Sequence, residues 1–320
     1  MLQNRDILVL GCGVSGLSTG ILLFKKGCRV SIWAKDLPPN TTSNKAGAFW
    51  FPYLCNPKDK ATVWAKQTLT YLKREIINDS RSGCSLRKCT EVFRHKVGPP
   101  WWADAVDRYE RPTKQELPEG YEDGYEIEAV LMDTTIYMDY LVNQFKSLGG
   151  SIIQKEILDI RDALNGCPIV INCTGLGSHT LFNDLSIYPV RGQTVKVKPN
   201  GFNEVIADDE AHNNLAYIIP RVHDIVLGGT AQVNDWNLNV DPKDTEEILR
   251  KCAAIRPEFK NVEIIGVSVG LRPARDVIRL ETEEYGEKFV IHNYGHGGAG
   301  FTLSWGCAQE VLEKVQKLFN

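Results

Sequence analysis

The sequence predicts an α/β protein in which a parallel sheet shares one chain with a second, β-rich module. A strand, a glycine-rich turn, a helix and another strand follow one another within the first 35 residues. This order is typical of a parallel βαβ unit. Residues 188–235 instead contain short strands bounded by turn residues. Segments of the two kinds alternate along the chain, so we expect two interleaved modules.

Size, composition and charge narrow the class of protein. The chain has 320 residues, 43% of them hydrophobic and 24% charged, enough to bury one large core or two moderate ones. A formal charge of −3 and no long Lys/Arg stripe give no electrostatic case for nucleic acid. No apolar run approaches the roughly 20 residues that span a bilayer, and the N-terminus lacks a signal-peptide pattern. We expect small-molecule partners, no membrane and a cytoplasmic location.

The nine cysteines are odd in number and scattered, often within apolar strands. Free thiols in a reducing compartment explain them better than a disulfide framework. No Cys/His cluster has the spacing of a zinc site, and we predict no metal.

Hydrophobic periodicity and turn residues predict the elements in order. The N-terminal unit is a strand at residues 7–10, a turn at 11–16, a helix at 17–26 and a second strand at 30–33. An irregular segment follows at 38–57, then a helix at 60–77 and a mixed sheet-and-loop region at 80–130. After these come a helix at 135–148 and a strand at 151–154. The rest comprises a buried strand in "CPIVINCTGLGS", strands across 188–235, a helix over 244–254, strands at 264–270 and 289–293, and a closing helix.

The first glycine-rich turn, Gly11-Cys12-Gly13-Val14-Ser15-Gly16, has the form GxGxxG between a strand and a helix. Its glycines allow a tight turn and close approach to a pyrophosphate, which the helix N-terminus attracts. Asp36 follows Gly16 by 20 residues, near the spacing of a ribose-binding acid, although Lys35 competes for that position. The pattern favours dinucleotide binding, and the alternative is a strand-to-helix turn without a ligand.

A second glycine run, residues 296–300, precedes Thr302 and the closing helix. If this helix N-terminus points into the same cleft, its free N–H groups would stabilise an anion, including the charge of a reduced flavin. The alternative is a flexible loop.

Two side chains further along are candidates for binding a carboxylate. Arg272 in "VGLRPARDVIRLE" lies between an apolar strand and Pro273, and an arginine held there can form two parallel hydrogen bonds. Tyr217 in "LAYIIP" is a second candidate. The alternative for Arg272 is an ordinary surface charge, and the alternative for Tyr217 is ordinary core packing.

Taken together, "WAKDLPPNTTS", "NCTG", "LAYIIP", "GLRPARDVIRLE" and "HNYGHGGAG" stand in one order after the first glycine run. From about residue 7 to residue 312 the chain resembles the D-amino acid oxidase and D-aspartate oxidase family. The resemblance implies non-covalent FAD and a discontinuous Rossmann-type FAD-binding domain with an interleaved β-rich substrate-binding domain. The expected bounds are 1–75, 131–186 and 270–320 for the first domain, and 76–130 and 187–269 for the second.

The resemblance also implies which residues meet the ligands. Those expected at FAD are Gly11, Gly13, Val14, Ser15, Gly16, Lys35, Asp36, Thr41, Thr42, Ser43, Gly47, Ile157, Thr174, Gly175, Arg272, Gly297, Gly298, Gly300, Phe301 and Thr302. Those expected at the substrate are Tyr217 and Arg272 for its carboxylate, the Gly298 carbonyl for its amine, and Phe49, Phe51 and Asn213 around it.

The implied reaction leaves no side chain as an obvious acid or base. Hydride passes from the α-carbon to flavin N5, with alignment supplied by the protein and the chemistry by the cofactor. Dioxygen reoxidises the flavin to give hydrogen peroxide, and the imino acid hydrolyses to a 2-oxo acid and ammonia. The resemblance leaves a homodimer open, and the ending Leu318-Phe319-Asn320 is not an SKL-like peroxisomal signal.

Several positions depart from the animal members of the family. Phe49 and Phe51 replace an aliphatic residue and a glutamine, and the loop before Tyr217 is shorter, with Asn213 near the place of a tyrosine. Acidic residues 208–210, and Ala231 where D-aspartate oxidases carry an arginine, predict a preference for neutral D-amino acids over D-aspartate, with basic ones allowed. A solvated loop is the alternative for 208–210. An NAD dehydrogenase, a non-catalytic FAD-binding protein and a glycine or sarcosine oxidase are the competing functions.

Overall fold

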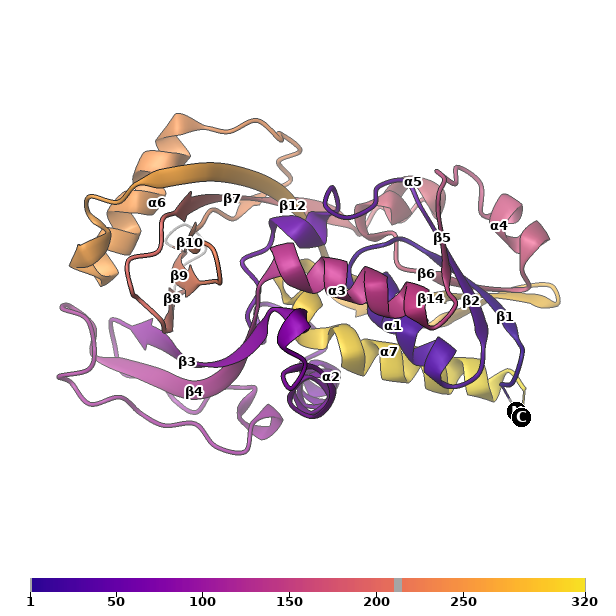
Figure 1. The fold of residues 1–320 in the computed structure, drawn as a ribbon, viewed down its shortest axis with the longest axis horizontal. Helices are drawn as coiled ribbons and strands as arrows, with labels where there is room; N and C mark the ends of the chain where they lie inside the picture. The colour runs from indigo at the N-terminus through magenta and orange to yellow at the C-terminus, as the bar shows by residue number, and fades with distance from the viewer. Residues whose placement is uncertain (1, 210–214, 320) are drawn as a thin grey trace.

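A computed structural model describes residues 2–209 and 215–319 of the chain. Its helices and strands are arranged around two sheets that lie side by side along the long axis of the molecule (Figure 1). The first sheet has six strands in the order β13-β14-β6-β1-β2-β5, and all pair in parallel except β13 with β14. These strands are β1 (Asp6–Leu10), β2 (Arg29–Ala34), β5 (Ser151–Gln154), β6 (Ile169–Asn172), β13 (Thr282–Tyr285) and β14 (Lys288–His292).

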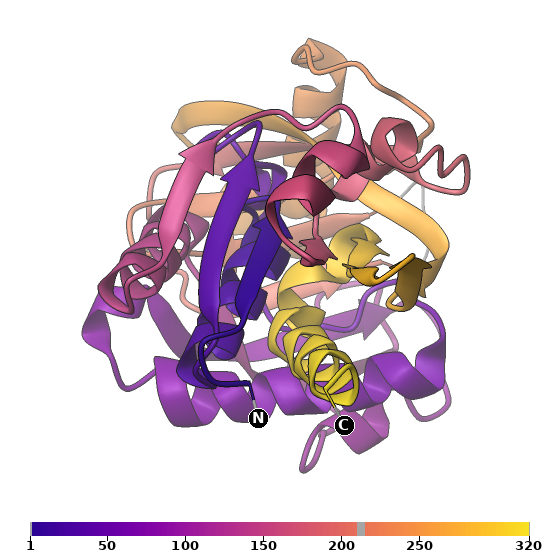
Figure 2. The same cartoon turned by 90° about the vertical axis from the view of Figure 1, so that its right-hand side faces the viewer.

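The first sheet is buried on both faces, as its alternating side chains show. In β1, Ile7 and Val9 pack into the main core with α1 (Val14–Lys25), α3 (Thr134–Ser147) and α7 (Gly300–Lys317). The intervening Leu8 and Leu10 pack into a separate core with α4 (Ile160–Gly166). Because successive strand residues point to opposite faces, the continuous apolar run of β1 serves both layers. Figure 2 shows this arrangement from the side, with α7 ending near the start of β1.

The second sheet has nine strands and is mostly antiparallel. Its order is β15-β12-β7-β10-β9-β8-β3-β4, with β11 paired to β7 and with β3 parallel to β8. A separate core lies between this sheet and α6 (Pro242–Ile255), where Ile248 and Cys252 pack against Val195 and Leu227. The strands are β3 (Cys84–Phe93), β4 (Asp123–Met132), β7 (Tyr188–Val197), β8 (Val205–Asp208), β9 (Ala216–Pro220), β10 (Ile225–Gly228), β11 (Gln232–Val233), β12 (Ile264–Arg279) and β15 (Tyr294–His296).

The remaining elements are helical. α2 (Lys58–Tyr71) continues into a π-helical turn, η2 (Leu72–Ile76), so one helical stretch covers the predicted range 60–77 except for its last residue. α2 packs closely on α7, where a Cβ added at Gly306 would lie 2.2 Å from the Trp64 carbonyl oxygen. The short helices are η1 (Thr42–Lys45), η3 (Ser80–Ser82), η4 (Ala103–Ala105), η5 (Gly175–Gly177), α5 (Ser178–Leu181), η7 (Pro257–Phe259) and η8 (Gly297–Ala299).

The predicted boundaries need three corrections. α1 begins at Val14 rather than at residue 17, because Ser15 and Gly16 of the glycine motif already lie in its first turn. α4 lies in a segment for which no helix was predicted. The strand expected at 264–270 continues through Pro273 to Arg279, and Pro273 pairs with Pro189 of β7. A strand tolerates proline where no amide has to donate across the ladder.

The division into two domains at the expected bounds stays a prediction. The long strand β12 crosses the expected boundary at residue 270 and pairs with β7 of the second sheet on both sides of it. Within residues 2–209 and 215–319, no helix combines the length and apolar character that crossing a membrane requires.

Candidate active site

A cavity of about 820 Å³ lies at the carboxyl ends of the parallel strands of the first sheet. Residues directly after β1, β2 and β6 line it on one side, and residues of β9, β12 and the start of α7 line it on the other. Ligands of α/β proteins bind at this edge of the sheet, and the volume is typical of cofactor and ligand sites. The two glycine runs, almost a whole chain length apart, thus meet at one cavity.

Most residues predicted at the ligands line this cavity. Those expected at the cofactor are Gly11, Gly13, Val14, Ser15, Lys35, Asp36, Thr41, Thr42, Ser43, Gly47, Ile157, Thr174, Gly175, Gly297, Gly298, Gly300 and Phe301. Phe49, Phe51, Tyr217 and Arg272, expected at the substrate, also belong to the lining. Gly16 and Thr302 do not line the cavity, and Asn213 lies outside the described residues.

The first glycine turn is folded tightly onto its own backbone. Gly11 has φ +105°, and an added Cβ would lie 2.4 Å from the carbonyl oxygen of Cys173, which follows β6. A Cβ at Gly16 would lie 2.0 Å from the Gly11 carbonyl oxygen. Gly16 therefore does not face the cavity but lets α1 pack against the turn. This packing brings the start of the helix close to any bound group.

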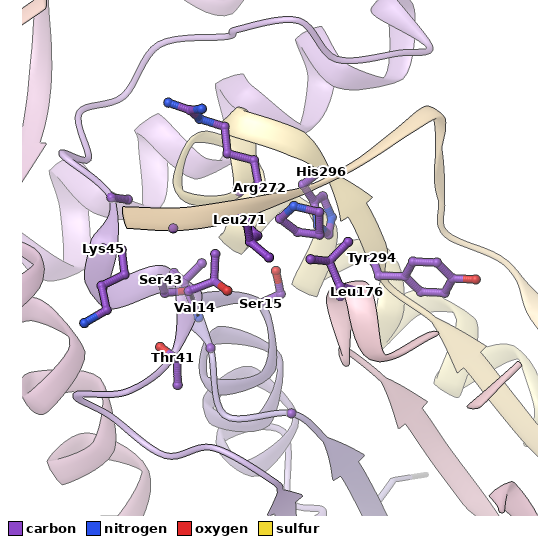
Figure 3. A pocket seen from close by; sticks show the side chains of 18 of the residues that line it. Val14, Ser15, Thr41, Ser43, Lys45, Leu176, Leu271, Arg272, Tyr294 and His296 are labelled. Atoms are coloured by element: carbon purple, nitrogen blue, oxygen red, sulfur yellow. Dashed lines mark hydrogen bonds between the residues drawn. The ribbon is translucent and has the colours of Figure 1, made fainter. Parts of the chain in front are cut away.

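The N-terminus of α1 opens into the cavity. Gly13, the residue before this helix, has no side chain that could cap it, and the first turn carries no acidic residue. The Val14 N–H donates to Ser43 Oγ at 3.0 Å, which draws η1 against the helix. Figure 3 shows Val14, Ser15 and Ser43 gathered at this end of the helix. A helix N-terminus with few partners attracts anions through its N–H groups and its dipole.

The N-terminus of α7 is arranged in the same way. Ala299 precedes the helix without a side-chain cap, and the first turn again lacks an acidic residue. Thr302 faces away from the cavity because its hydroxyl donates to the Phe51 carbonyl at 2.8 Å and accepts from the Phe51 N–H at 3.1 Å. It thus fixes the aromatic segment beside the helix. One cavity therefore receives two helix N-termini, which suits a long ligand with negative charge in two places.

His296, in the wall of the cavity, also indicates that a ligand binds there. It is 5% exposed, and its Nε2 is buried with no hydrogen-bond partner among the described residues. Burial lowers the pKa of this imidazole to about 4, so it is neutral at pH 7. A buried ring nitrogen without a partner is costly unless a ligand supplies one.

Arg272 is placed by the strand register and by a neighbouring glycine. It lies on β12, and its Nη1 donates to the Thr230 carbonyl at 2.8 Å. A Cβ at Gly192 of β7 would lie 2.4 Å from this nitrogen, so only glycine leaves room for the guanidinium. Leu271 and Arg272 project from opposite sides of β12, as alternation along a strand requires (Figure 3).

Tyr217 joins Arg272 in the cavity. Burial raises the pKa of Tyr217, while a hydrogen bond from Arg272 and the guanidinium charge lower it in part. The net effect is a raised pKa, so the hydroxyl stays protonated at neutral pH and can donate to a bound anion. A Cβ at Gly228 would lie 2.0 Å from the Tyr217 ring, which shows how closely β10 approaches it. Arginine and tyrosine together form a donor pair suited to a carboxylate.

Tyr53 and Asp209 are among the lining residues that were not predicted as ligand contacts. Tyr53 lines the cavity near Arg272, and burial raises its pKa to about 12. Asp209 also lines it, within electrostatic reach of Tyr53. Tyr53 follows a segment without regular periodicity, so nothing in the pattern indicated its orientation. Asp209 was recognised only as one of three neighbouring acidic residues.

Of the acidic residues 208–210, the two that the structure describes, Asp208 and Asp209, do not both face the cavity. Asp208 is 1% exposed and accepts a hydrogen bond from the Tyr121 hydroxyl at 2.7 Å. It also forms an ion pair with Arg94 at 2.7 Å. The prediction that Asp208 repels an acidic substrate is wrong, because its side chain lies on the opposite face of β8 from the cavity. Asp209 remains at the cavity, and Glu210 lies outside the described residues.

Residues 6–314 match the FAD dependent oxidoreductase family. The chain belongs to this family. Its relatives include a D-amino-acid oxidase of Dictyostelium discoideum, 54% identical over 98% of this chain and 92% of that protein. A D-amino-acid oxidase of Rubrobacter xylanophilus is 39% identical over 95% of this chain and 94% of that one. The human D-aspartate oxidase is 33% identical over 99% and 96%, respectively. These relatives confirm the family resemblance seen in the sequence.

Solved structures of other proteins share the fold. A glycine oxidase from Bacillus cereus superimposes with a TM-score of 0.81 over 98% of this chain and 95% of that one, at 18% identity. The cavity fits the cofactor that the family name states. Gly11, Gly13 and the start of α1 would hold the pyrophosphate, Lys35 and Asp36 would flank the adenosine ribose, and the start of α7 would meet the flavin.

Proposed function

We propose that the chain catalyses the FAD-dependent oxidation of D-amino acids by dioxygen. One D-amino acid, dioxygen and water give a 2-oxo acid, ammonia and hydrogen peroxide. The observation that carries this proposal is the Arg272–Tyr217 pair, two carboxylate donors in a cavity that also receives the N-termini of α1 and α7. The similarity to two D-amino-acid oxidases over nearly the whole chain supports it.

When bound, FAD would supply the chemistry, a hydride acceptor for the substrate α-carbon and a two-electron donor for dioxygen. The protein contributes alignment. Arg272 and Tyr217 hold the carboxylate, and the Gly298 carbonyl accepts a hydrogen bond from the amine. With both groups fixed, only one enantiomer presents its α-hydrogen to the flavin side of the cavity. No acid or base among the described side chains is needed for this transfer, and the imino acid hydrolyses after it is formed.

We further propose that neutral side chains are preferred over that of D-aspartate. Phe49 and Phe51 stack with ring centroids 5.7 Å apart and give the cavity an apolar wall. Asp209 lines the same region, so a second carboxylate on the substrate would meet a like charge. Ala231 supplies no cation to offset this repulsion.

The test is peroxide formation by the FAD-loaded protein with a panel of amines. D-alanine, D-methionine and D-phenylalanine should be oxidised, and L-alanine should not. A higher kcat/KM for D-aspartate than for all three would move the protein to the D-aspartate oxidases. Turnover of glycine or sarcosine without turnover of D-alanine would instead make it a glycine or sarcosine oxidase.

A further inference from the structure

A buried asparagine lies where β6 ends at the edge of the cavity. Asn172 is fully buried, and its side-chain oxygen accepts from the Thr174 N–H at 3.1 Å and from the Thr174 hydroxyl at 2.7 Å. Its side-chain nitrogen lies 3.0 Å from Ser178 Oγ and 3.1 Å from His292 Nδ1. A backbone N–H can only donate, so the amide atom that faces Thr174 has to be the oxygen. This one contact fixes the orientation of the whole amide.

The direction of the other hydrogen bonds follows from that orientation. The Thr174 hydroxyl gives its proton to Asn172, so at 2.9 Å from Ser178 Oγ it can only accept. Ser178 in turn accepts from the Asn172 nitrogen, which closes a triangle of three side chains. The second N–H of that nitrogen points at His292 Nδ1, and Nδ1 therefore accepts. His292 carries its proton on Nε2 and donates it to Glu283 Oε2 at 2.9 Å.

His292 is built into the sheet beside this triangle. It pairs with Asn172 in the parallel register of β14 and β6, is fully buried, and packs nearly perpendicular to the Phe182 ring with centroids 4.7 Å apart. Burial lowers the pKa of its imidazole, while the hydrogen bond with Glu283 raises it in part, so the net shift favours the neutral form. Glu283 is itself held by a hydrogen bond from Arg279 at 3.1 Å. A side-chain amide does not pass protons on, so this chain orients groups and is not a proton relay.

The triangle holds a turn that lines the cavity. Residues 174–176 follow β6 directly and belong to the cavity wall, where Figure 3 shows Leu176, while Asn172 and His292 are not part of that wall. The Thr174 N–H and hydroxyl proton are both bonded to Asn172, so neither is free to donate to a ligand. The hydroxyl oxygen keeps one acceptor position, which suits a hydroxyl group of a bound cofactor. The conformation of the turn therefore depends on the Asn172 amide, and the amide depends on His292 Nδ1.

We propose that His292 is a positioning residue for the cofactor, because by accepting from Asn172 it holds the turn 174–176 in the conformation that binds FAD. This inference rests on the proposed function, which places FAD in the cavity, and extends it to a side chain outside the cavity wall. Without an acceptor at Nδ1, one N–H of the buried amide would lose its partner. The amide would then rotate toward another acceptor, and the triangle that fixes Thr174 would open.

Two substitutions of His292 separate this role from packing. His292→Asn places an amide oxygen near the position of Nδ1, where it can still accept from Asn172, but it does not reach Glu283. His292→Gln extends past that position toward Glu283 and leaves Asn172 without an acceptor. Both remove the imidazole from Phe182, so the loss of packing is similar. Titration of the apoprotein with FAD should give a dissociation constant raised at least about tenfold in His292→Gln and at most about threefold in His292→Asn.

His223→Gln, at an exposed histidine outside the cavity wall, is the control and should leave the dissociation constant of FAD unchanged. A measurement on the unmodified protein guards against variants that fail to fold. Nitrogen NMR of the FAD-loaded protein, with isotope-labelled histidine, should show His292 at neutral pH as the uncharged tautomer with its proton on Nε2.

Equal dissociation constants in His292→Asn and His292→Gln, whether raised or not, would reduce His292 to a packing residue and overturn the inference. A proton on Nδ1 in the NMR spectrum would overturn it as well. Failure of the proposed function would look different, as FAD binding without oxidation of any D-amino acid, and the two dissociation constants would still decide the role of His292. An unmodified chain that binds no FAD would overturn both.

Discussion

Arg272 reaches the cavity from β12 because the strand beside it carries a glycine. The guanidinium donates from Nη1 to the Thr230 carbonyl, at 2.8 Å, and the side chain also hydrogen-bonds Tyr217. Its planar fork leaves other donors for a carboxylate, and lysine cannot reproduce this geometry. The substrate contact at this position therefore depends on shape as well as on charge.

Arg272→Lys should raise the KM for D-alanine by about 100-fold, since it keeps the charge but loses the paired hydrogen bonds. The dissociation constant of FAD should change by less than about threefold, because the glycine turn and α1 hold the larger part of the cofactor. Steady-state kinetics and flavin fluorescence titration measure the two effects. Arg108→Lys, at a side chain 83% exposed, is the matched control. Unchanged kinetics in Arg272→Lys would remove the substrate assignment.

His296 gives a prediction for pH. Its folded pKa of about 4 lies below the ordinary 6.5, so the unfolded chain takes up a proton first as the pH falls. The free energy of unfolding should therefore decrease between pH 6.5 and about 4, by about 2 kcal/mol from this group at pH 4.5. Urea unfolding of the apoprotein at pH 7 and pH 4.5 should show a smaller loss in His296→Gln than in the unmodified chain. Equal losses would mean that His296 is not buried in its neutral form.

At this scale Arg272 and Tyr217 were predicted from the family resemblance, since the strand pattern alone left their roles open, and both line the cavity. Tyr53 and His292 could not be found in this way. Tyr53 lies in an irregular segment, and the contact of His292 with Asn172 depends on the parallel pairing of β14 with β6. Such pairing joins segments more than 100 residues apart and leaves no local pattern.

At the scale of elements, the cavity is formed by the residues that precede α1 and α7 and by the first turns of these two helices. Neither Gly13 before α1 nor Ala299 before α7 caps its helix with its own side chain, and Gly11 and Gly16 bring the backbone close at the start of α1. The glycines of the chain differ in the atoms that surround them. Substitutions at different glycines can therefore separate an effect on backbone conformation from an effect on ligand binding.

Gly11→Ala should weaken FAD binding by about 100-fold or more, because the new Cβ would lie 2.4 Å from the Cys173 carbonyl oxygen and force the turn open. Gly120 is the matched control, since it also has a positive φ, +84°, but nothing lies within 4 Å of its added Cβ. Gly120→Ala should cost about 1 kcal/mol of stability through backbone strain and leave FAD affinity unchanged. Titration of each apoprotein with FAD checks both results. Tight FAD binding by Gly11→Ala would contradict the role given to the turn.

Gly192→Ala should raise the KM for D-alanine by about tenfold while the protein stays folded, because the flexible guanidinium of Arg272 can move aside from the new Cβ. Gly266→Ala on the paired strand is the control, since its nearest neighbour is a lysine carbon at 3.9 Å. Kinetics and thermal unfolding of both variants are the measurements. A loss of stability in Gly192→Ala without any change in KM would show that the glycine serves packing alone.

Periodicity predicted most elements well, including β5, whose bounds agree at both ends. It failed where tertiary contacts override local signals. Pro273 should end a strand, yet β12 continues because Pro189 lies opposite. α4 was missed because a helix of seven residues shows too little periodicity to detect.

On the scale of the whole molecule, the cavity unites segments from both sheets. Residues after β1, β2 and β6 face residues of β9 and β12, and α7 links them from the C-terminal part of the chain. The meeting of the two glycine runs at one cavity was predictable from the family resemblance, while the second run alone was also compatible with a flexible loop. The residues that each sheet contributes to the substrate end of the cavity were not predictable, because they depend on the pairing of strands that are far apart in the sequence.

FAD should therefore stabilise the whole chain and not one half of it. A free FAD concentration 100 times the dissociation constant should add about 2.7 kcal/mol to the free energy of unfolding. Thermal melts followed by far-UV circular dichroism and by tryptophan fluorescence should shift together to higher temperature. If one signal melts at an unchanged temperature, the cavity does not couple the two sheets.

The most direct test of the central claim is the visible spectrum of the FAD-loaded protein under anaerobic conditions. Addition of D-alanine should bleach the flavin band, and the same concentration of L-alanine should leave it unchanged. That result would establish the cofactor, the reaction and the chirality in one experiment. A protein that takes up no FAD, or a flavin band that L-alanine bleaches and D-alanine does not, would contradict the account.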